Sequence, residues 1–130
     1  MRDVRVASDG TKFGQDITSG PHRLRADEDA DQGGGGTGVG PHELLLGALG
    51  ACTSMTLRLY AERKGWRLAT VHVALTGEAV DGKYAITRKI TMVGDLDAEQ
   101  RQRLLEIADK CPVHRTLTGE VVIQTTAVPA

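Results

Sequence analysis

The sequence predicts an α+β domain in which mostly antiparallel strands cover one long, buried central helix. Residues 41–65 have the composition of a buried helix, alternating apolar residues on both sides of Asp81-Gly82 predict a strand hairpin, and residues 98–110 predict a shorter amphipathic helix. At 130 residues the chain is long enough for one hydrophobic core but short for two, so we expect a single domain over residues 1–130.

The central helix is predicted by its ends and by its lack of charge. Pro41 suits the first helical position, and Gly65 suits the residue just after the last one. Residues 44–57 carry no formal charge, which is typical of a helix buried on all sides. The uncharged run is shorter than the roughly 18 residues of a membrane span, so we expect no membrane partner.

Short strands are predicted before this helix. Val4 and Val6 indicate a first strand, residues 13–17 its hairpin partner, and residues 22–26 a third strand. The following segment, residues 27–40, is acidic and then rich in glycine. It lacks the Lys-Ser/Thr pair of a phosphate-binding loop, so we interpret it as a flexible connection.

After the central helix, residues 66–80 and 84–93 predict the two strands of a hairpin. Arg88 interrupts the apolar face of the second strand, and we expect it to reach the sheet edge or to pair with a carboxylate. Asp97 and Gln100 predict a capping box that opens the helix over residues 98–110, and Pro112 ends it. Residues 120–128 predict a closing strand.

A row of small residues precedes the middle of the central helix, and something can approach the helix closely there: Gly47, Ala48, Gly50 and Ala51. Either another backbone of the same chain or a second copy of the helix fits this description. Because one sheet can cover only part of a helix that is apolar all round, we predict an intertwined homodimer.

Charge and composition exclude some functions. The net charge is −1, from 16 basic and 17 acidic side chains, and aromatic residues make up only 3%. Neither a basic surface nor a set of stacking side chains is available for nucleic acid, so we expect no nucleic-acid partner. The first ten residues contain no apolar stretch of the kind found in signal peptides, so we expect a cytoplasmic protein.

Two cysteines are the residues most capable of chemistry. Cys52 lies within the predicted central helix and Cys111 at the end of the second helix. Each can be a small buried hydrophobe, or the two can form a redox pair if their Cα atoms lie within roughly 7 Å. A reactive Cys52 needs a nearby cation. At about 100° per residue, His42 lies closer to the azimuth of Cys52 than Glu43 does.

Metal binding is a weaker interpretation of these residues. Only Cys111 and His114 have the close spacing of a ligand pair, and no second close pair accompanies them. His22 and His72 fall in predicted strands, where we expect them on the surface. The sequence therefore predicts no metal and no organic cofactor.

Two long motifs carry a family resemblance. PHELLLGALGACTSMTLRLYAERKGW and the later LLEIADKCPVHRTLTGEVVI resemble the osmotically inducible protein C / organic hydroperoxide resistance (OsmC/Ohr) family, in its general OsmC-like branch. The resemblance runs from about Gly33 to the end of the chain. It implies an OsmC-like fold, with curved, mostly antiparallel sheets around a long buried helix in an intertwined homodimer.

The resemblance also implies an activity. Characterised members are thiol peroxidases, antioxidant oxidoreductases that reduce organic hydroperoxides to alcohols in the oxidative stress response. Cys52 matches the peroxidatic cysteine, which becomes a sulfenic acid, and Cys111 the resolving cysteine, which forms a redox-active disulfide with it. The implied reductant is a small dithiol or a lipoylated protein.

One part of the family pattern differs here. The family places an arginine from an amino-terminal segment near the cysteine and holds it with a glutamate directly after the proline that opens the helix. In this chain His42 follows Pro41, and Glu43 comes one position later. Arg25 is the best match for the arginine and Arg23 the next.

This departure favours an alternative function, a redox-responsive OsmC-like protein that binds a small apolar ligand without efficient turnover. A structural dimer with inert thiols is the third interpretation.

Overall fold

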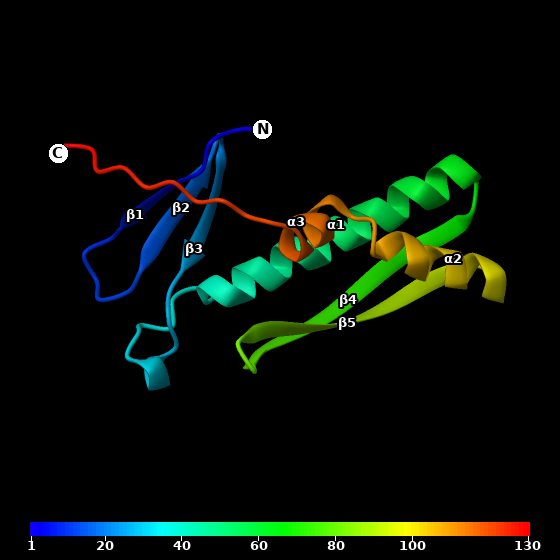
Figure 1. The fold of residues 1–130 in the computed structure, drawn as a ribbon, viewed down its shortest axis with the longest axis horizontal. Coiled ribbons are helices and arrows are strands. Elements are labelled where there is room, and N and C mark those ends of the chain that lie inside the picture. The colour runs from blue at the N-terminus through cyan, green and yellow to red at the C-terminus, as the bar shows by residue number, and fades with distance from the viewer. The chain divides into compact units, whose positions relative to one another are not determined.

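The computed structural model describes residues 1–130, which form two compact units, residues 1–47 and 48–130. Both sheets are antiparallel and helices accompany them, so the predicted α+β class is confirmed. Figure 1 follows the chain through all of its elements. The long helix α1, Pro41–Lys64, begins in the first unit, and most of it belongs to the second.

The first unit is built on a three-stranded meander of β1 (Arg5–Ser8), β2 (Gln15–Ser19) and β3 (His22–Ala26). β2 begins two residues later than the sequence predicted. The reason is the loop before it, where the backbone N–H and the hydroxyl of Thr11 both donate to Asp9 Oδ1, at 3.0 and 2.6 Å. These local bonds compete with strand pairing and delay it.

The connection after β3 is ordered around a buried carboxylate, whereas the sequence predicted only a flexible segment. Asp27 is 4% exposed and accepts hydrogen bonds from the backbone N–H groups of Glu28, Gly35 and Thr37. The Thr37 hydroxyl donates to it as well, at 2.5 Å. The short 3₁₀ helix η1, Ala30–Gln32, lies within this loop. A single acceptor thus satisfies several backbone donors of a glycine-rich segment.

The second unit combines α1 with the long hairpin of β4 (Arg67–Val80) and β5 (Lys83–Asp95). The predicted turn is confirmed, with φ angles of 50° at Asp81 and 76° at Gly82. Figure 1 shows the hairpin running along α1, with α2 (Ala98–Ala108) beside its open end. One cluster of buried side chains joins these elements: Leu57, Ala61, Leu68, Leu104, Ile107 and Ala108.

The region after α2 differs from the prediction. The Asp97–Gln100 capping box is present, but α2 ends at Ala108 rather than at residue 110. A further helix, α3 (Pro112–Thr118), follows, with Cys111 as its N-cap and Pro112 in its first turn. Pro112 is compatible with the end of α2 because a proline cannot continue a helix. It also suits the start of α3, because the first turn of a helix leaves its N–H groups unpaired and a proline has none.

The predicted closing strand over residues 120–128 does not form in this single chain. Residues 119–130 have no regular secondary structure and are exposed, including Val122 and Ile123. Alternating β-branched residues favour a strand only where another strand accepts their backbone hydrogen bonds. Residues 119–130 pair with no strand of this chain.

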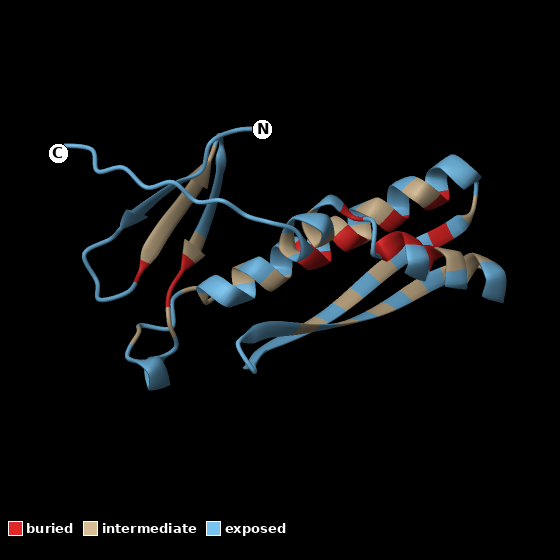
Figure 2. Cartoon of the chain, viewed as in Figure 1, coloured by how far each residue is buried: buried red, intermediate tan, exposed pale blue.

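α1 is buried along one face only. Its buried residues are Leu49, Gly50, Thr53, Leu57 and Ala61, whereas Met55 is 70% exposed and Leu59 48%. Figure 2 shows the buried residues as a broken stripe along the helix. By length and composition alone α1 could also cross a membrane, a property that the core helices of soluble proteins share. The sheet thus covers only part of this helix, as the sequence predicted.

Candidate functional site

The two cysteines occupy different settings in the second unit. Cys52 lies midway along α1 and is partly buried, next to the fully buried Thr53. Cys111 is completely buried, and its Sγ accepts a hydrogen bond from the backbone N–H of His114 at 3.3 Å. Both are free thiols.

Arg88 of β5 connects the segments that carry these cysteines. Its Nη1 donates to the Thr53 hydroxyl at 3.1 Å, and its Nη2 donates to Asp109 Oδ1 at 2.9 Å. Nη2 also lies 3.1 Å from His114 Nδ1. Since arginine can only donate, His114 Nδ1 is the acceptor, and the proton of the neutral ring is on Nε2.

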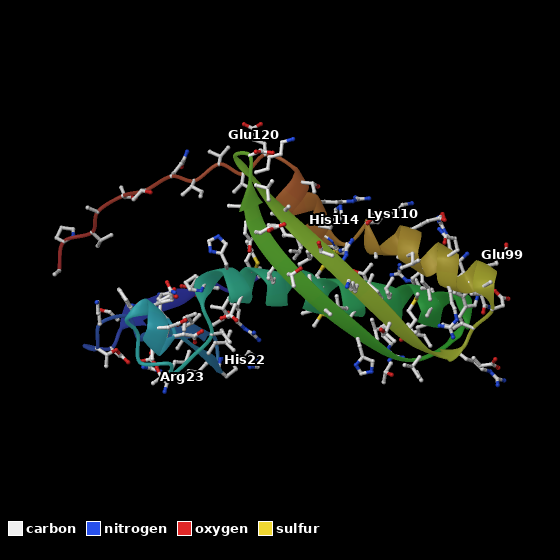
Figure 3. The ribbon with its side chains drawn as sticks, turned by 90° about the horizontal axis from the view of Figure 1, so that it is seen from below. His22, Arg23, Glu99, Lys110, His114 and Glu120 are labelled. Atoms are coloured by element: carbon white, nitrogen blue, oxygen red, sulfur yellow. The ribbon has the colours of Figure 1, made fainter.

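The guanidinium thus binds residues that lie within three positions of Cys52 or Cys111 in the sequence. Its side chain is only 12% exposed, and the carboxylate partner that the sequence predicted for Arg88 is Asp109. Figure 3 labels His114 on α3, close to the β4–β5 hairpin. Sequence reasoning missed Arg88 as a site residue, although a charge in the middle of an apolar strand face was the available signal.

A pocket of about 400 Å³ lies beside this cluster. It combines the charged group of Arg88, Asp109 and His114 with apolar side chains from α1, β5 and α3. Its lining residues are Leu49, Tyr84, Ile86, Arg88, Asp109, His114, Leu117 and Thr118. The arrangement offers an apolar wall next to a hydrogen-bonding end. A second hollow, near Tyr60 and Trp66, involves none of these residues.

Arg25, the predicted arginine of the site, belongs to the first unit. It forms ion pairs with Asp9 and with Asp16, the latter at 3.3 Å, and its Nε donates to the Thr37 hydroxyl at 3.0 Å. The Thr11 hydroxyl and then Arg25 lower the pKa of Asp9 well below its usual range. Arg25 is therefore held by two carboxylates, and its role near Cys52 stays a prediction.

The start of α1 has its own hydrogen bond. Glu43 Oε1 accepts from the backbone N–H of Gly40 at 2.7 Å, so this carboxylate caps the helix. His42 is exposed beside it. His22 and Arg23, labelled on the first unit in Figure 3, are exposed, as is His72 on β4, which confirms the surface positions predicted for the two histidines.

No group of three or more His, Cys, Asp or Glu side chains is arranged to hold a metal ion. The Arg88 cluster itself supplies a guanidinium, an imidazole and a carboxylate.

Comparisons with known proteins agree with this fold. An OsmC-like protein from Mycoplasma pneumoniae has a TM-score of 0.77 and 20% identity, covering 92% of this chain and 88% of its own. An organic hydroperoxide resistance protein from Legionella pneumophila has a TM-score of 0.65 and 20% identity, covering 92% and 90%. The organic hydroperoxide resistance protein OhrB of Bacillus subtilis has a TM-score of 0.60 and 23% identity, covering 92% and 91%.

No curated protein matches the chain. The family model described as OsmC-like protein matches residues 33–126, which include both cysteine segments and Arg88. This match covers most of the 130 residues, and the solved structures share the same α+β fold. The chain therefore belongs to the OsmC-like protein family.

Proposed function

We propose that this protein is a thiol-dependent peroxidase that reduces organic hydroperoxides to alcohols. The observation that carries the proposal is the Arg88 cluster, in which one largely buried guanidinium contacts Thr53, the residue after Cys52, and also Asp109 and His114, which flank Cys111 in the sequence. Some proteins of similar fold are described as organic hydroperoxide resistance proteins, which supports the same chemistry.

The proposed cycle uses only the two thiols and the substrate. The Cys52 thiolate attacks the peroxide, the O–O bond breaks, and the alcohol leaves with a proton while Cys52 becomes a sulfenic acid. Cys111 then displaces the hydroxyl as water and forms a disulfide with Cys52. A small dithiol or a lipoylated protein restores both thiols by exchange.

The pocket favours an organic rather than an inorganic peroxide. Leu49, Ile86 and Leu117 supply apolar surface to a pocket whose other side is charged. Burying an alkyl group against such surface is favourable by about 25 cal/mol for each Å² of apolar area. Hydrogen peroxide has no alkyl group and gains nothing from it.

We also propose that the protein works as a homodimer in the cytoplasm. The exposed apolar side chains of α1, among them Met55 and Leu59, and those of residues 121–123 need a cover in water. The α1 helix of a second copy is a suitable cover, because its exposed small residues Ala48 and Ala51 allow the two helices to approach closely.

One equivalent of cumene hydroperoxide added to the reduced protein tests the peroxidase proposal. We expect mass spectrometry to find both thiols lost and an intramolecular Cys52–Cys111 link. Cys111→Ser should stop at the sulfenic acid, trapped by dimedone, and Cys52→Ser should not react. Unchanged thiols in the wild-type protein contradict the proposal.

The alternative function is binding of a small apolar ligand by a protein whose cysteines respond to oxidation without efficient turnover. Two observations favour it: His42 follows Pro41, and Arg25 is held by Asp9 and Asp16. A large gain in peroxidase rate for His42→Glu would support it, because the variant restores the family's glutamate. Steady turnover by the wild-type protein with a dithiol would exclude it.

A further inference from the structure

Every side chain that forms a hydrogen bond with Arg88 lies close in sequence to a cysteine. Thr53 directly follows Cys52, while Asp109 lies two residues before Cys111 and His114 three residues after it. The guanidinium extends from β5 and binds α1 through one nitrogen and the region around Cys111 through the other. One side chain thus links both cysteine segments.

The segment around Cys111 is a tight junction between two short helices. Asp109 is the C-cap of α2, and Cys111 is the N-cap of α3. His114 contacts both parts of the site, because its backbone N–H donates to Cys111 Sγ while its ring accepts from Arg88. The position of the buried thiol therefore depends on the contacts that Arg88 makes around it.

Lysine cannot reproduce these contacts. A guanidinium donates from separate nitrogens in fixed directions, whereas an ammonium is a single point at the end of a flexible chain. The bonds from Nη1 to Thr53 and from Nη2 to Asp109 require the two separate donors. Thr53 is fully buried, so its hydroxyl stays in place to receive the first bond.

We propose that Arg88 is a positioning residue for the step that joins Cys52 and Cys111. It holds the α2–α3 junction against the part of α1 that bears Cys52, so Cys111 attacks as a neighbouring rather than a diffusing thiol. This inference rests on the proposed function. In the step, the Cys111 sulfur forms the S–S bond, the S–O bond of the Cys52 sulfenic acid breaks, and the hydroxyl leaves with the thiol proton as water. Arg88 exchanges neither protons nor electrons.

An aromatic disulfide, dithiobis(nitrobenzoate), tests this step without any peroxide. The Cys52 thiolate attacks the reagent and releases one coloured thiolate, leaving a mixed disulfide. Cys111 then attacks the Cys52 sulfur and releases a second coloured thiolate. The reagent meets Cys52 first because Cys111 is fully buried. The rate of the second release therefore measures how well Cys111 is positioned.

We expect Arg88→Met to slow the second release about tenfold or more while the first release changes little. Arg88→Lys should recover little of the rate. Asp109→Ala removes one contact from a side chain that is 70% exposed, so it should fold normally and slow the second release by a smaller factor.

Arg101→Met is the matched control. Arg101 donates to the backbone carbonyl oxygens of Met92, Leu96 and Gly94, at 2.6, 3.3 and 3.0 Å. Its loss should lower the melting temperature without slowing the second release. Melting curves of all variants separate positioning from a general loss of structure.

Two results overturn the inference. In the first, Arg88→Met and Asp109→Ala both release the second coloured thiolate as fast as the wild-type protein does. In the second, the wild-type protein itself releases no second thiolate. The proposed function fails separately: if cumene hydroperoxide leaves both thiols unchanged while the second release still depends on Arg88, the peroxidase proposal is wrong and the positioning role stands.

Discussion

The hydroxyl of Thr53 donates to the carbonyl oxygen of Leu49 at 2.7 Å, one turn earlier in α1, and accepts from Arg88 Nη1 at 3.1 Å. A fully buried threonine on an apolar helix thereby provides the acceptor for a nearly buried arginine. The bond to Leu49 fixes the direction of the hydroxyl proton, and it leaves the oxygen lone pairs facing the guanidinium.

Thr53→Val should destabilise the protein by about 1–3 kcal/mol, because a valine of similar shape leaves Arg88 Nη1 without this acceptor. Urea unfolding measures the loss. Thr53→Ser keeps the hydroxyl and removes only a methyl group, so it should lose less. Equal stability of the valine variant and the wild-type protein would show that Arg88 finds another acceptor.

The core around α2 gives a second prediction with a neighbouring control. Leu104 is fully buried, so Leu104→Ala should cost about 2–5 kcal/mol through lost contacts and the cavity left behind. Leu105→Ala should lower the free energy of unfolding by clearly less, because Leu105 is 42% exposed. Thermal unfolding of both variants makes the comparison, and similar losses would mean that α2 is covered on both faces in solution.

Acid should loosen the loop that Asp27 organises. The Thr37 hydroxyl bond is the main cause that lowers the pKa of Asp27, with burial opposing it. A carboxylate whose folded pKa lies below its unfolded value, about 3.9, stabilises the fold above that value and loses the contribution as pH falls further. The protection of residues 27–37 against hydrogen exchange, taken relative to the unfolded-chain rate at the same pH, should therefore fall below about pH 4.

Asp27→Asn should lower the protection of this loop against hydrogen exchange at neutral pH, because the NH₂ group of asparagine is a donor facing backbone N–H groups that are also donors. The variant should also lose much of the acid dependence, because its side chain carries no ionisable group. Asp31→Asn, at an exposed position of η1, is the control and should behave like the wild-type protein. An unchanged acid profile in the Asp27 variant would assign the loosening to other groups.

The proposed dimer predicts a specific effect at the exposed face of α1. Met55→Glu should convert dimers to monomers, because a charge buried at an apolar interface without a partner is costly. Arg63→Glu, in the exposed last turn of the same helix, should leave the dimer intact. Sedimentation velocity distinguishes the two, and a monomeric wild-type protein would refute the dimer.

Elements with strong local signals could be predicted from the sequence. The Asp81-Gly82 turn requires positive φ angles, and the Asp97–Gln100 box satisfies its own helix end, so both depend on neighbouring residues alone. The bounds of β3 and of α1 agreed for the same reason. α3 was missed because a proline after a helix is compatible both with a stop and with a new start.

The candidate site was only partly predictable. Cys52 and Cys111 are visible as residue types, and Arg88 as an unusual charge in an apolar strand, but no sequence spacing relates positions 53, 88, 109 and 114. Their contacts arise only when β5 packs against α1 and the α2–α3 junction.

The sequence by itself determined the α+β class, the long apolar helix, the hairpin and the two thiols, because turns, caps and apolar periodicity act over a few residues. Only the tertiary structure decided which face of α1 is buried and that Arg88 binds Thr53, Asp109 and His114. It also decided that residues 120–128 form no strand in a single chain. Burial and strand pairing depend on surfaces that distant parts of the chain supply, and local sequence carries no record of where those surfaces meet.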